Sequence, residues 1–215
     1  METKNLNQTM SNETQMNEMV TLPRPMMSFK EAVSTCFSKY ATFTGRARRS
    51  EYWWFSLFSL LVILIPVIAI ILSTIGLGGS EFPEDFTVAG AIIVALSVLA
   101  IVVISLALLI PSLAVSTRRL HDTGRSGWWL VVYYVIYAVA DILEMFLPDI
   151  FEVFDGKETG FFNSIAELFH ASPVGFSVLT ALHLLMIGLG VTIFIFCLLD
   201  SHKGENKYGP SPKYQ

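Results

Sequence analysis

Three arginines within eight residues make up the densest group of charged side chains in this sequence. Arg118, Arg119 and Arg125 lie in the run RRLHDTGRSGWW. A guanidinium group is a rigid, planar donor that suits phosphate or carboxylate, and the two glycines of the run allow a tight turn with exposed backbone N–H groups. The run therefore indicates an anion or lipid-headgroup site. The alternative is a helix–turn–helix connection in which the arginines anchor the chain while Asp122 and Ser126 cap the helices.

A second group of ionisable residues lies inside long apolar runs. Asp141 and Glu144 are three residues apart, so they share one face of a helix. Measured from the ends of their runs at Trp128 and Leu199, Glu144 and His183 both lie about 24 Å deep at the rise of a helix. Groups at such depth usually face a partner or a water-filled cavity. Three interpretations stay open: a proton or cation path open to the outside, a buried hydrogen-bonded pair that joins the third and fourth helices, or a third helix that ends early among the outer headgroups.

No part of the sequence has the pattern of an active site. The pairs His121–Asp122 and His202–Glu205 do not have the spacing of zinc or calcium ligands. Motifs of a nucleophile, a phosphate-binding loop or a dinucleotide site are absent as well. We therefore expect a non-enzymatic protein that uses neither a metal nor a cofactor.

Four long apolar runs must position these polar groups. Each is long enough to cross a hydrocarbon layer of about 30 Å, which takes about 20 helical residues. With a mean hydropathy of +0.57 and 15% charged residues, the chain is too apolar for a soluble domain. The sequence therefore predicts an all-α polytopic membrane protein with four transmembrane helices and flanking amphipathic helices. The predicted spans are residues 53–75, 87–115, 128–147 and 174–199.

The basic residues are segregated by these runs. Thirteen of the fourteen lysines and arginines lie in the two flanks and in the loop between the second and third runs. Since lysine and arginine in short loops stay on the cytoplasmic side, we expect both termini in the cytoplasm. That side carries 13 basic and 8 acidic residues, a formal charge of +5. This charge suits an anionic inner leaflet and is too dispersed for nucleic acid.

The segments outside the spans are of several kinds. Residues 1–27 have the composition of a disordered polar tail without a signal peptide, and 28–213 form the membrane domain. An apolar stripe over 28–40 predicts a short helix that lies either on the membrane surface or against the ends of the spans. The outer loop, 148–173, is rich in phenylalanine and predicts another short helix. The two cysteines, Cys36 and Cys197, are expected to be buried without a disulfide.

Three motifs occur in order along the chain. They are FTGRARRSEYWWF at 43–55, RRLHDTGRSGWW at 118–129 and GENKYGPSP at 204–212. On these motifs the chain resembles the YhaH-like bacterial inner-membrane proteins, domain of unknown function 805, over about residues 28–213. The resemblance implies a small multi-span protein of the bacterial plasma membrane, and it implies no activity. The polar tail and the phenylalanine-rich outer loop depart from the family pattern.

The expected topology puts all three motifs on the inner face. We expect one polar cluster there, in which Glu51, Asp122 and Glu205 pair with arginines from other segments. The candidate anion or headgroup ligands are Arg46, Arg48, Arg49, Arg118, Arg119 and Arg125. The other members of the cluster are Asp200, His121, His202, Asn206, Lys207 and Tyr208.

The function that follows is a structural or interaction role at the plasma membrane. The inner cluster would engage anionic lipid headgroups or a partner protein, which includes a second copy of the chain. The alternative is a small transporter or channel subunit that uses Asp141, Glu144 and His183. With four spans, a transport path inside one chain is narrow, so this alternative suits an oligomer better.

Overall fold

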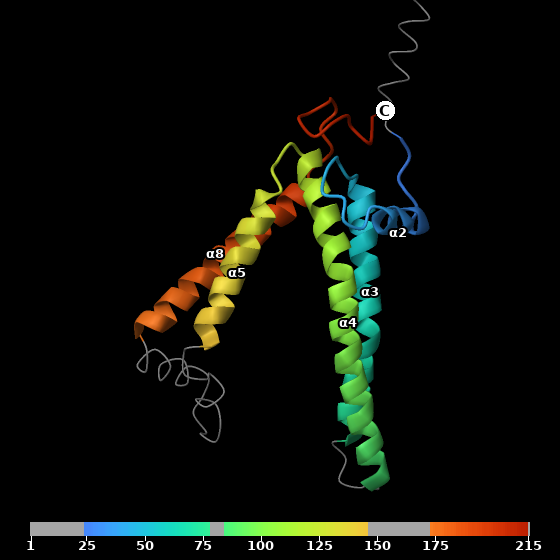
Figure 1. Cartoon of the computed structure of the whole chain (residues 1–215), viewed down its shortest axis with the longest axis vertical. Helices are drawn as coiled ribbons and strands as arrows, with labels where there is room; N and C mark the ends of the chain where they lie inside the picture. Colours follow the sequence, from blue (N-terminus) through green and yellow to red (C-terminus); the bar gives the residue numbers. More distant parts are fainter. Residues whose placement is uncertain (1–23, 78–83, 146–172, 215) are drawn as a thin grey trace, which may run out of the picture. The chain divides into compact units, whose positions relative to one another are not determined.

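The computed structural model describes residues 24–77, 84–145 and 173–214. These residues form five helices, labelled in Figure 1, and no strand. The helices are α2 (Phe29–Ser38), α3 (Arg49–Leu77), α4 (Glu84–Asp122), α5 (Trp128–Met145) and α8 (Pro173–Leu198). The expected polar tail lies almost wholly outside the described residues, as do the outer loop and its predicted helix.

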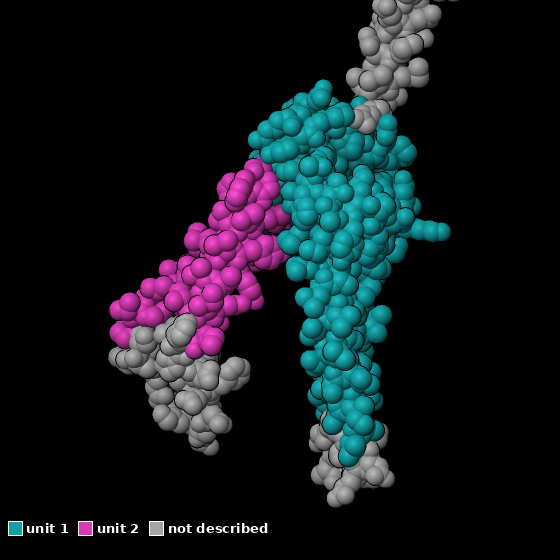
Figure 2. All heavy atoms as spheres, viewed as in Figure 1, with its two compact units in different colours: residues 1–125, 200–215 teal, residues 126–199 magenta. Residues whose placement is uncertain are grey.

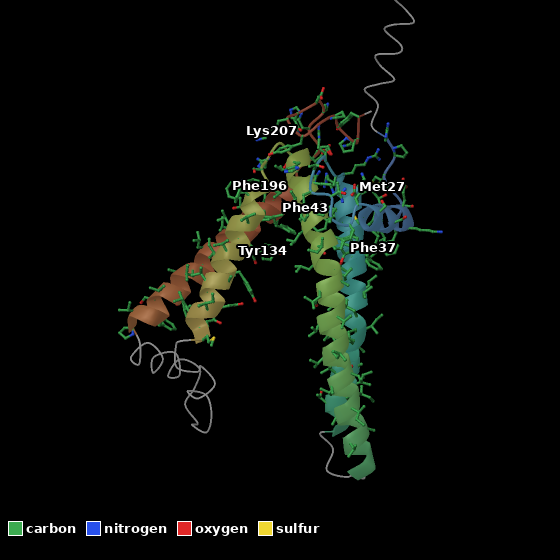
Figure 3. All side chains as sticks on the ribbon, in the orientation of Figure 1. Met27, Phe37, Phe43, Tyr134, Phe196 and Lys207 are labelled. Carbon is green, nitrogen blue, oxygen red and sulfur yellow. The ribbon has the colours of Figure 1, made fainter. Side chains whose placement is uncertain are left out.

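Four of these helices are long and apolar enough to cross a membrane: α3, α4, α5 and α8. Along all four, large apolar side chains project outwards and are exposed on the isolated chain (Figure 3). Apolar surface of this extent is typical of a protein that faces lipid. The prediction of an all-α membrane protein with four transmembrane helices is therefore confirmed.

Helix α4 is longer than the apolar run that predicted it. Its 39 residues continue past Pro111 to Asp122, which gives a length of about 58 Å. The helix does not end at Pro111, because a single missing N–H is tolerated inside a membrane helix. The arginines at 118 and 119, expected in a loop, lie instead on the last turns of this helix.

The described chain divides into two compact units (Figure 2). Unit 1 consists of Met1–Arg125 with Asp200–Gln215, and unit 2 consists of Ser126–Leu199. Unit 1 contains α2, α3, α4 and the C-terminal segment, whereas unit 2 contains α5 and α8. The polar groups of interest are distributed over both units and are described unit by unit.

In unit 1, α3 and α4 lie side by side and α2 packs across the beginning of α3 (Figure 1). Ser28 caps α2, since its hydroxyl accepts a hydrogen bond from the Glu31 N–H at 3.3 Å. Phe37 of α2 makes edge contacts with Phe55 and Phe58 of α3, both at 5.7 Å between ring centroids. Of the two positions expected for this amphipathic helix, the structure has the one against the ends of the spans.

In unit 2, α5 and α8 form an antiparallel pair. Trp129 of α5 contacts Phe196 of α8 edge to face, with ring centroids 5.5 Å apart. Further along the pair, Gly190 of α8 lies against the ring of Tyr133. These contacts at one end of the pair fix which face of α8 meets α5.

Candidate functional site

A buried network of charged side chains lies where α4 ends. Asp122, the last residue of α4, forms ion pairs with Arg119 and with Arg46, the latter at 2.9 Å between Nε and Oδ1. The Ser201 hydroxyl donates to the second carboxylate oxygen of Asp122 at 2.5 Å. The side chains of Arg46, Arg119 and Asp122 are at most 1% exposed. Asp122 therefore neutralises two buried arginines at once.

A second buried ion pair lies beside this one. Arg118 Nη1 is 2.5 Å from Glu51 Oε1, and the pair joins α4 to the first turn of α3. The Arg118 Nε and Nη2 atoms are buried, and no hydrogen-bond partner for them lies among the described residues. We call Arg46, Glu51, Arg118, Arg119 and Asp122 the arginine network.

Cys36 of α2 contacts the network through its thiol, which donates to Glu51 Oε1 at 3.8 Å. Burial, followed by the adjacent Glu51 carboxylate, raises the pKa of the Cys36 thiol to about 12. A thiol with this pKa stays protonated at neutral pH, so it is a poor nucleophile and a poor metal ligand. Cys36 and Cys197 are both buried and free of disulfides, as the sequence predicts.

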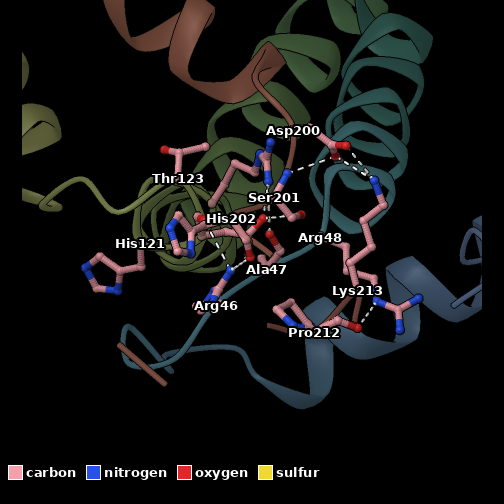
Figure 4. Close-up of polar contacts among 12 residues, drawn as sticks. Arg46, Ala47, Arg48, His121, Thr123, Asp200, Ser201, His202, Pro212 and Lys213 are labelled. Atoms are coloured by element: carbon pink, nitrogen blue, oxygen red, sulfur yellow. Dashed lines mark hydrogen bonds and ion pairs between the residues drawn. The ribbon is translucent and has the colours of Figure 1, made fainter. Parts of the chain in front are cut away.

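Arg46 connects the network to the C-terminal segment (Figure 4). Its Nη1 atom donates to the carbonyls of Gly204 and Gly209, at 2.8 and 3.1 Å. Its Nη2 atom donates to the carbonyl of His202 at 2.6 Å and to that of Asp122 at 3.3 Å. Every nitrogen of this guanidinium thus has a partner within the protein, and three of the accepting carbonyls belong to the C-terminal segment.

The C-terminal segment forms a tight turn against the end of α4. Asn206 and Gly209 exchange backbone hydrogen bonds, and the Asn206 amide donates to the His121 carbonyl at 2.9 Å. The Tyr208 ring stacks on the His121 ring, with centroids 3.7 Å apart and planes 4° from parallel. Gly209 has φ +112°, a conformation that other residues rarely adopt. The third motif is therefore a structural turn that seals the network.

A cavity of about 520 Å³ lies in unit 1 beside the network. Arg48 joins the N-terminal and C-terminal segments beside the cavity. Its Nε atom donates to the Pro212 carbonyl at 2.6 Å and its Nη1 atom to the Pro25 carbonyl at 3.0 Å. Lys213 pairs with Asp200 at 2.6 Å between Nζ and Oδ2 (Figure 4). The lining residues are Arg24, Pro25, Met26, Arg48, Arg49, Ser50, Trp53, Trp54, Leu57, Asp200, Ser201 and Lys213.

The structure divides the six arginines expected to bind an anion. Arg46, Arg118 and Arg119 are buried and paired within the protein, so they have structural partners already. Arg48 and Arg49 line the cavity. Arg125 lies beyond α4, where its Nη1 atom donates to the carbonyl of Thr123 at 3.1 Å.

The expected partnership of Glu205 is wrong for the described residues. Glu205 is exposed and forms no ion pair there with an arginine. Its position is taken by Ser201 and by backbone carbonyls, which reach Asp122 and Arg46 from the same segment. Lys207 is also exposed, and its ammonium lies 5.0 Å from the centroid of the Tyr208 ring. Arg24, Lys213 and Ser201 could not be identified from the sequence, because none of them belongs to a recognisable spacing.

The ionisable residues of the spans lie in unit 2. His183 Nε2 is 3.3 Å from Glu144 Oε1, and both side chains are about half exposed on the isolated chain, at 49% and 45%. The other ring nitrogen of His183 is 2.9 Å from the Leu179 carbonyl. Asp141, one helical turn before Glu144, is exposed. Glu144 and His183 therefore make a contact between α5 and α8, but the pair is half exposed on the isolated chain and not buried as one of the three interpretations required. No group of three or more His, Cys, Asp or Glu side chains within the described ranges could hold a metal ion.

Comparison with known proteins agrees with the three motifs. A family model described as "Protein of unknown function (DUF805)" matches residues 40–210. Inner membrane protein YhaI of Escherichia coli is 41% identical over 97 residues, which cover 45% of this chain and 64% of that protein. Inner membrane protein YhaH of Escherichia coli is 34% identical over 96 residues, which cover 45% of this chain and 66% of that protein. No solved structure matches the chain.

The matched relatives are longer than the part of them that this chain covers, which is just under two thirds in each case. Their names place them in the inner membrane and give no activity. The family model, in contrast, covers most of this chain and includes the whole arginine network. The chain therefore belongs to the DUF805 family and is an integral membrane protein related to inner membrane proteins of bacteria.

Proposed function

We propose that this protein is non-enzymatic and acts as an interaction protein of the inner membrane, whose cytoplasmic face engages anionic lipid headgroups. The observation that carries the proposal is the division of its basic residues into two sets. Three arginines are buried in the network, where their ion pairs hold this face in a single conformation. Other cations lie around an open cavity beside the network.

The network itself suits structure better than ligand binding. An anion bound by Arg46 would have to displace four backbone carbonyls and the carboxylate of Asp122. Breaking a buried ion pair in this way costs about 3–5 kcal/mol. Binding at the cavity requires no such exchange, because the charge of Arg49 is exposed at its edge.

The cytoplasmic position of this face is part of the proposal. It rests on the segregation of thirteen of the fourteen lysines and arginines to one side of the spans. A single cysteine introduced at Lys203 should react with a membrane-impermeant maleimide only after the cells are opened. A cysteine introduced at Asn163, in the expected outer loop, is the matched control and should react in intact cells. Labelling of the Lys203→Cys variant in intact cells would contradict the orientation.

The lipid preference is tested with the whole chain. The protein is extracted from membranes in mild detergent and the retained lipids are identified by native mass spectrometry. We expect phosphatidylglycerol or another anionic lipid to be enriched over its share in the bulk membrane extract. Retention in proportion to the bulk composition would contradict the proposal, and a retained protein chain instead of lipid would favour a partner protein or an oligomer.

Transport is a second candidate, favoured by the Glu144–His183 pair in the spans. Ionisable residues within a membrane segment commonly belong to a proton or ion path. Proton flux into liposomes that contain the purified protein tests this function. A His183→Leu variant should abolish any flux that depends on the pair, and equal flux from both proteins would exclude a relay through His183.

A further inference from the structure

The cavity at the start of α3 carries an excess of positive charge. Four cationic side chains line it against the single carboxylate of Asp200, so its formal charge is +3. Lys213 already neutralises Asp200, with both carboxylate oxygens within 2.7 Å of its ammonium. The charges of Arg48 and Arg49 therefore have no carboxylate partner among the residues that line the cavity.

The internal bonds of Arg48 hold its side chain in place without neutralising it. Both of its described acceptors, Pro25 and Pro212, are backbone carbonyls. Burial and then repulsion by the nearby Arg24 lower the pKa of the Arg48 guanidinium, against the opposite effect of the Glu31, Glu51 and Asp122 carboxylates. Arg49 is exposed and forms no hydrogen bond or ion pair with the described part of the chain. A bound anion would relieve this repulsion.

The lining changes from basic to apolar along one face of α3. Arg49, Trp53 and Leu57 are spaced by four residues, so they lie one above another on the helix. The same face continues into the span through Leu61 and Leu64, which are 48% and 41% exposed. Tryptophan is enriched at the headgroup level of membranes. The cavity therefore begins at the depth of phosphate groups and continues onto a surface that meets acyl chains.

We propose that this cavity binds the headgroup of an anionic phospholipid, with the phosphate at Arg48 and Arg49 and an acyl chain along Trp53 and Leu57. Its volume of about 520 Å³ is in the range of small-molecule sites. A free phosphate ester offers the same charge, but it would leave the apolar part of the cavity unused. This site specifies where the proposed lipid interaction occurs, and it rests on that proposed function.

The test compares lipid binding by variants of the full chain in detergent. Phosphatidylglycerol and phosphatidylcholine are added in turn, and bound lipid is measured by native mass spectrometry. Arg49→Gln should weaken phosphatidylglycerol binding about tenfold, because it removes one charge-assisted hydrogen bond and leaves every observed internal bond intact. Arg49→Glu should weaken it further. Lys203→Gln, which removes an exposed charge outside the cavity lining, should bind as the unmodified chain does.

The outcomes separate this site from the broader function. Preference of the unmodified chain for phosphatidylglycerol, lost in both Arg49 variants, supports the site. The same preference with unchanged binding by both variants would overturn the site and leave the lipid function in place. Equal binding of the two lipids would overturn the function. Glycerol 3-phosphate provides the free-phosphate arm: if it displaces the lipid fully at millimolar concentration, the assignment to a phospholipid is wrong.

Discussion

Replacement of Asp122 by asparagine tests the arginine network at its central residue. The substitution keeps the size of the side chain and removes the carboxylate charge with which Arg46 and Arg119, both buried, form ion pairs. Removing one partner of a buried pair destabilises a protein by about 3–5 kcal/mol. For a chain of this length each kcal/mol lowers the melting temperature by about 2–4 °C, so we expect a fall of about 6–20 °C.

The matched control is Asp200→Asn, the same chemical change at an exposed ion pair. Asp200 and Lys213 are 52% and 27% exposed, so the solvent screens their attraction. The control should cost less than about 1 kcal/mol. Thermal unfolding in detergent measures the stability of both variants. Protease cleavage anywhere beyond residue 202 reports whether the C-terminal segment has detached from Arg46. A loss in Asp122→Asn no larger than that of the control would refute the assignment of Asp122 as the centre of the network.

Three further predictions concern other parts of the same face. Glu51→Gln and Arg118→Met should each destabilise the protein by about 3 kcal/mol. The double variant should lose less than the sum, because it contains no unpaired buried charge. Additive losses in the free energy of unfolding would show that Glu51 and Arg118 do not interact. Gly209→Ala should cost about 1–3 kcal/mol because φ +112° is strained for alanine, and loss of protease protection at the C-terminal segment measures this. Hydrogen bonding from Lys213 lowers the pKa of Asp200, so their pair stabilises the protein above the ordinary carboxyl value of about 4 and is lost as the pH falls through the lower folded value. Thermal unfolding of the unmodified chain and of Asp200→Asn should therefore differ above about pH 4 and converge below it, and convergence near pH 6 would contradict this sign.

The four spans could be predicted because length and apolarity decide whether a helix crosses a membrane. The position of α2 could not, since its apolar stripe fits lipid and protein equally well. Its contacts with Phe55 and Phe58 depend on which face of α3 is turned towards α2. The extension of α4 to Asp122 was also missed, because the composition of residues 116–122 suits a polar helix end as well as a loop.

The partners of the arginines were only partly predictable for a related reason. Topology brings the three motifs to one face, and Glu51 and Asp122 are the acidic residues of the first two. Which acid of the C-terminal segment would complete the cluster depended on the turn at 206–209, which directs Glu205 to solvent and places backbone carbonyls on Arg46. Backbone acceptors have no signature in the sequence, so a search for charged partners favours the wrong residue.

The residue range matched by the family model distinguishes the arginine network from the cavity. Residues 40–210 contain every member of the arginine network and the turn that seals it. They exclude Arg24 and Lys213, two of the four cations of the cavity. The network therefore lies wholly within the part of the chain that the family model matches, whereas two of the four cations of the cavity lie outside it. Exchanging Arg24 and Lys213 for neutral residues should leave folding largely intact and reduce lipid binding. Substitutions within the network should have the opposite effect and destabilise the fold before they reduce lipid binding.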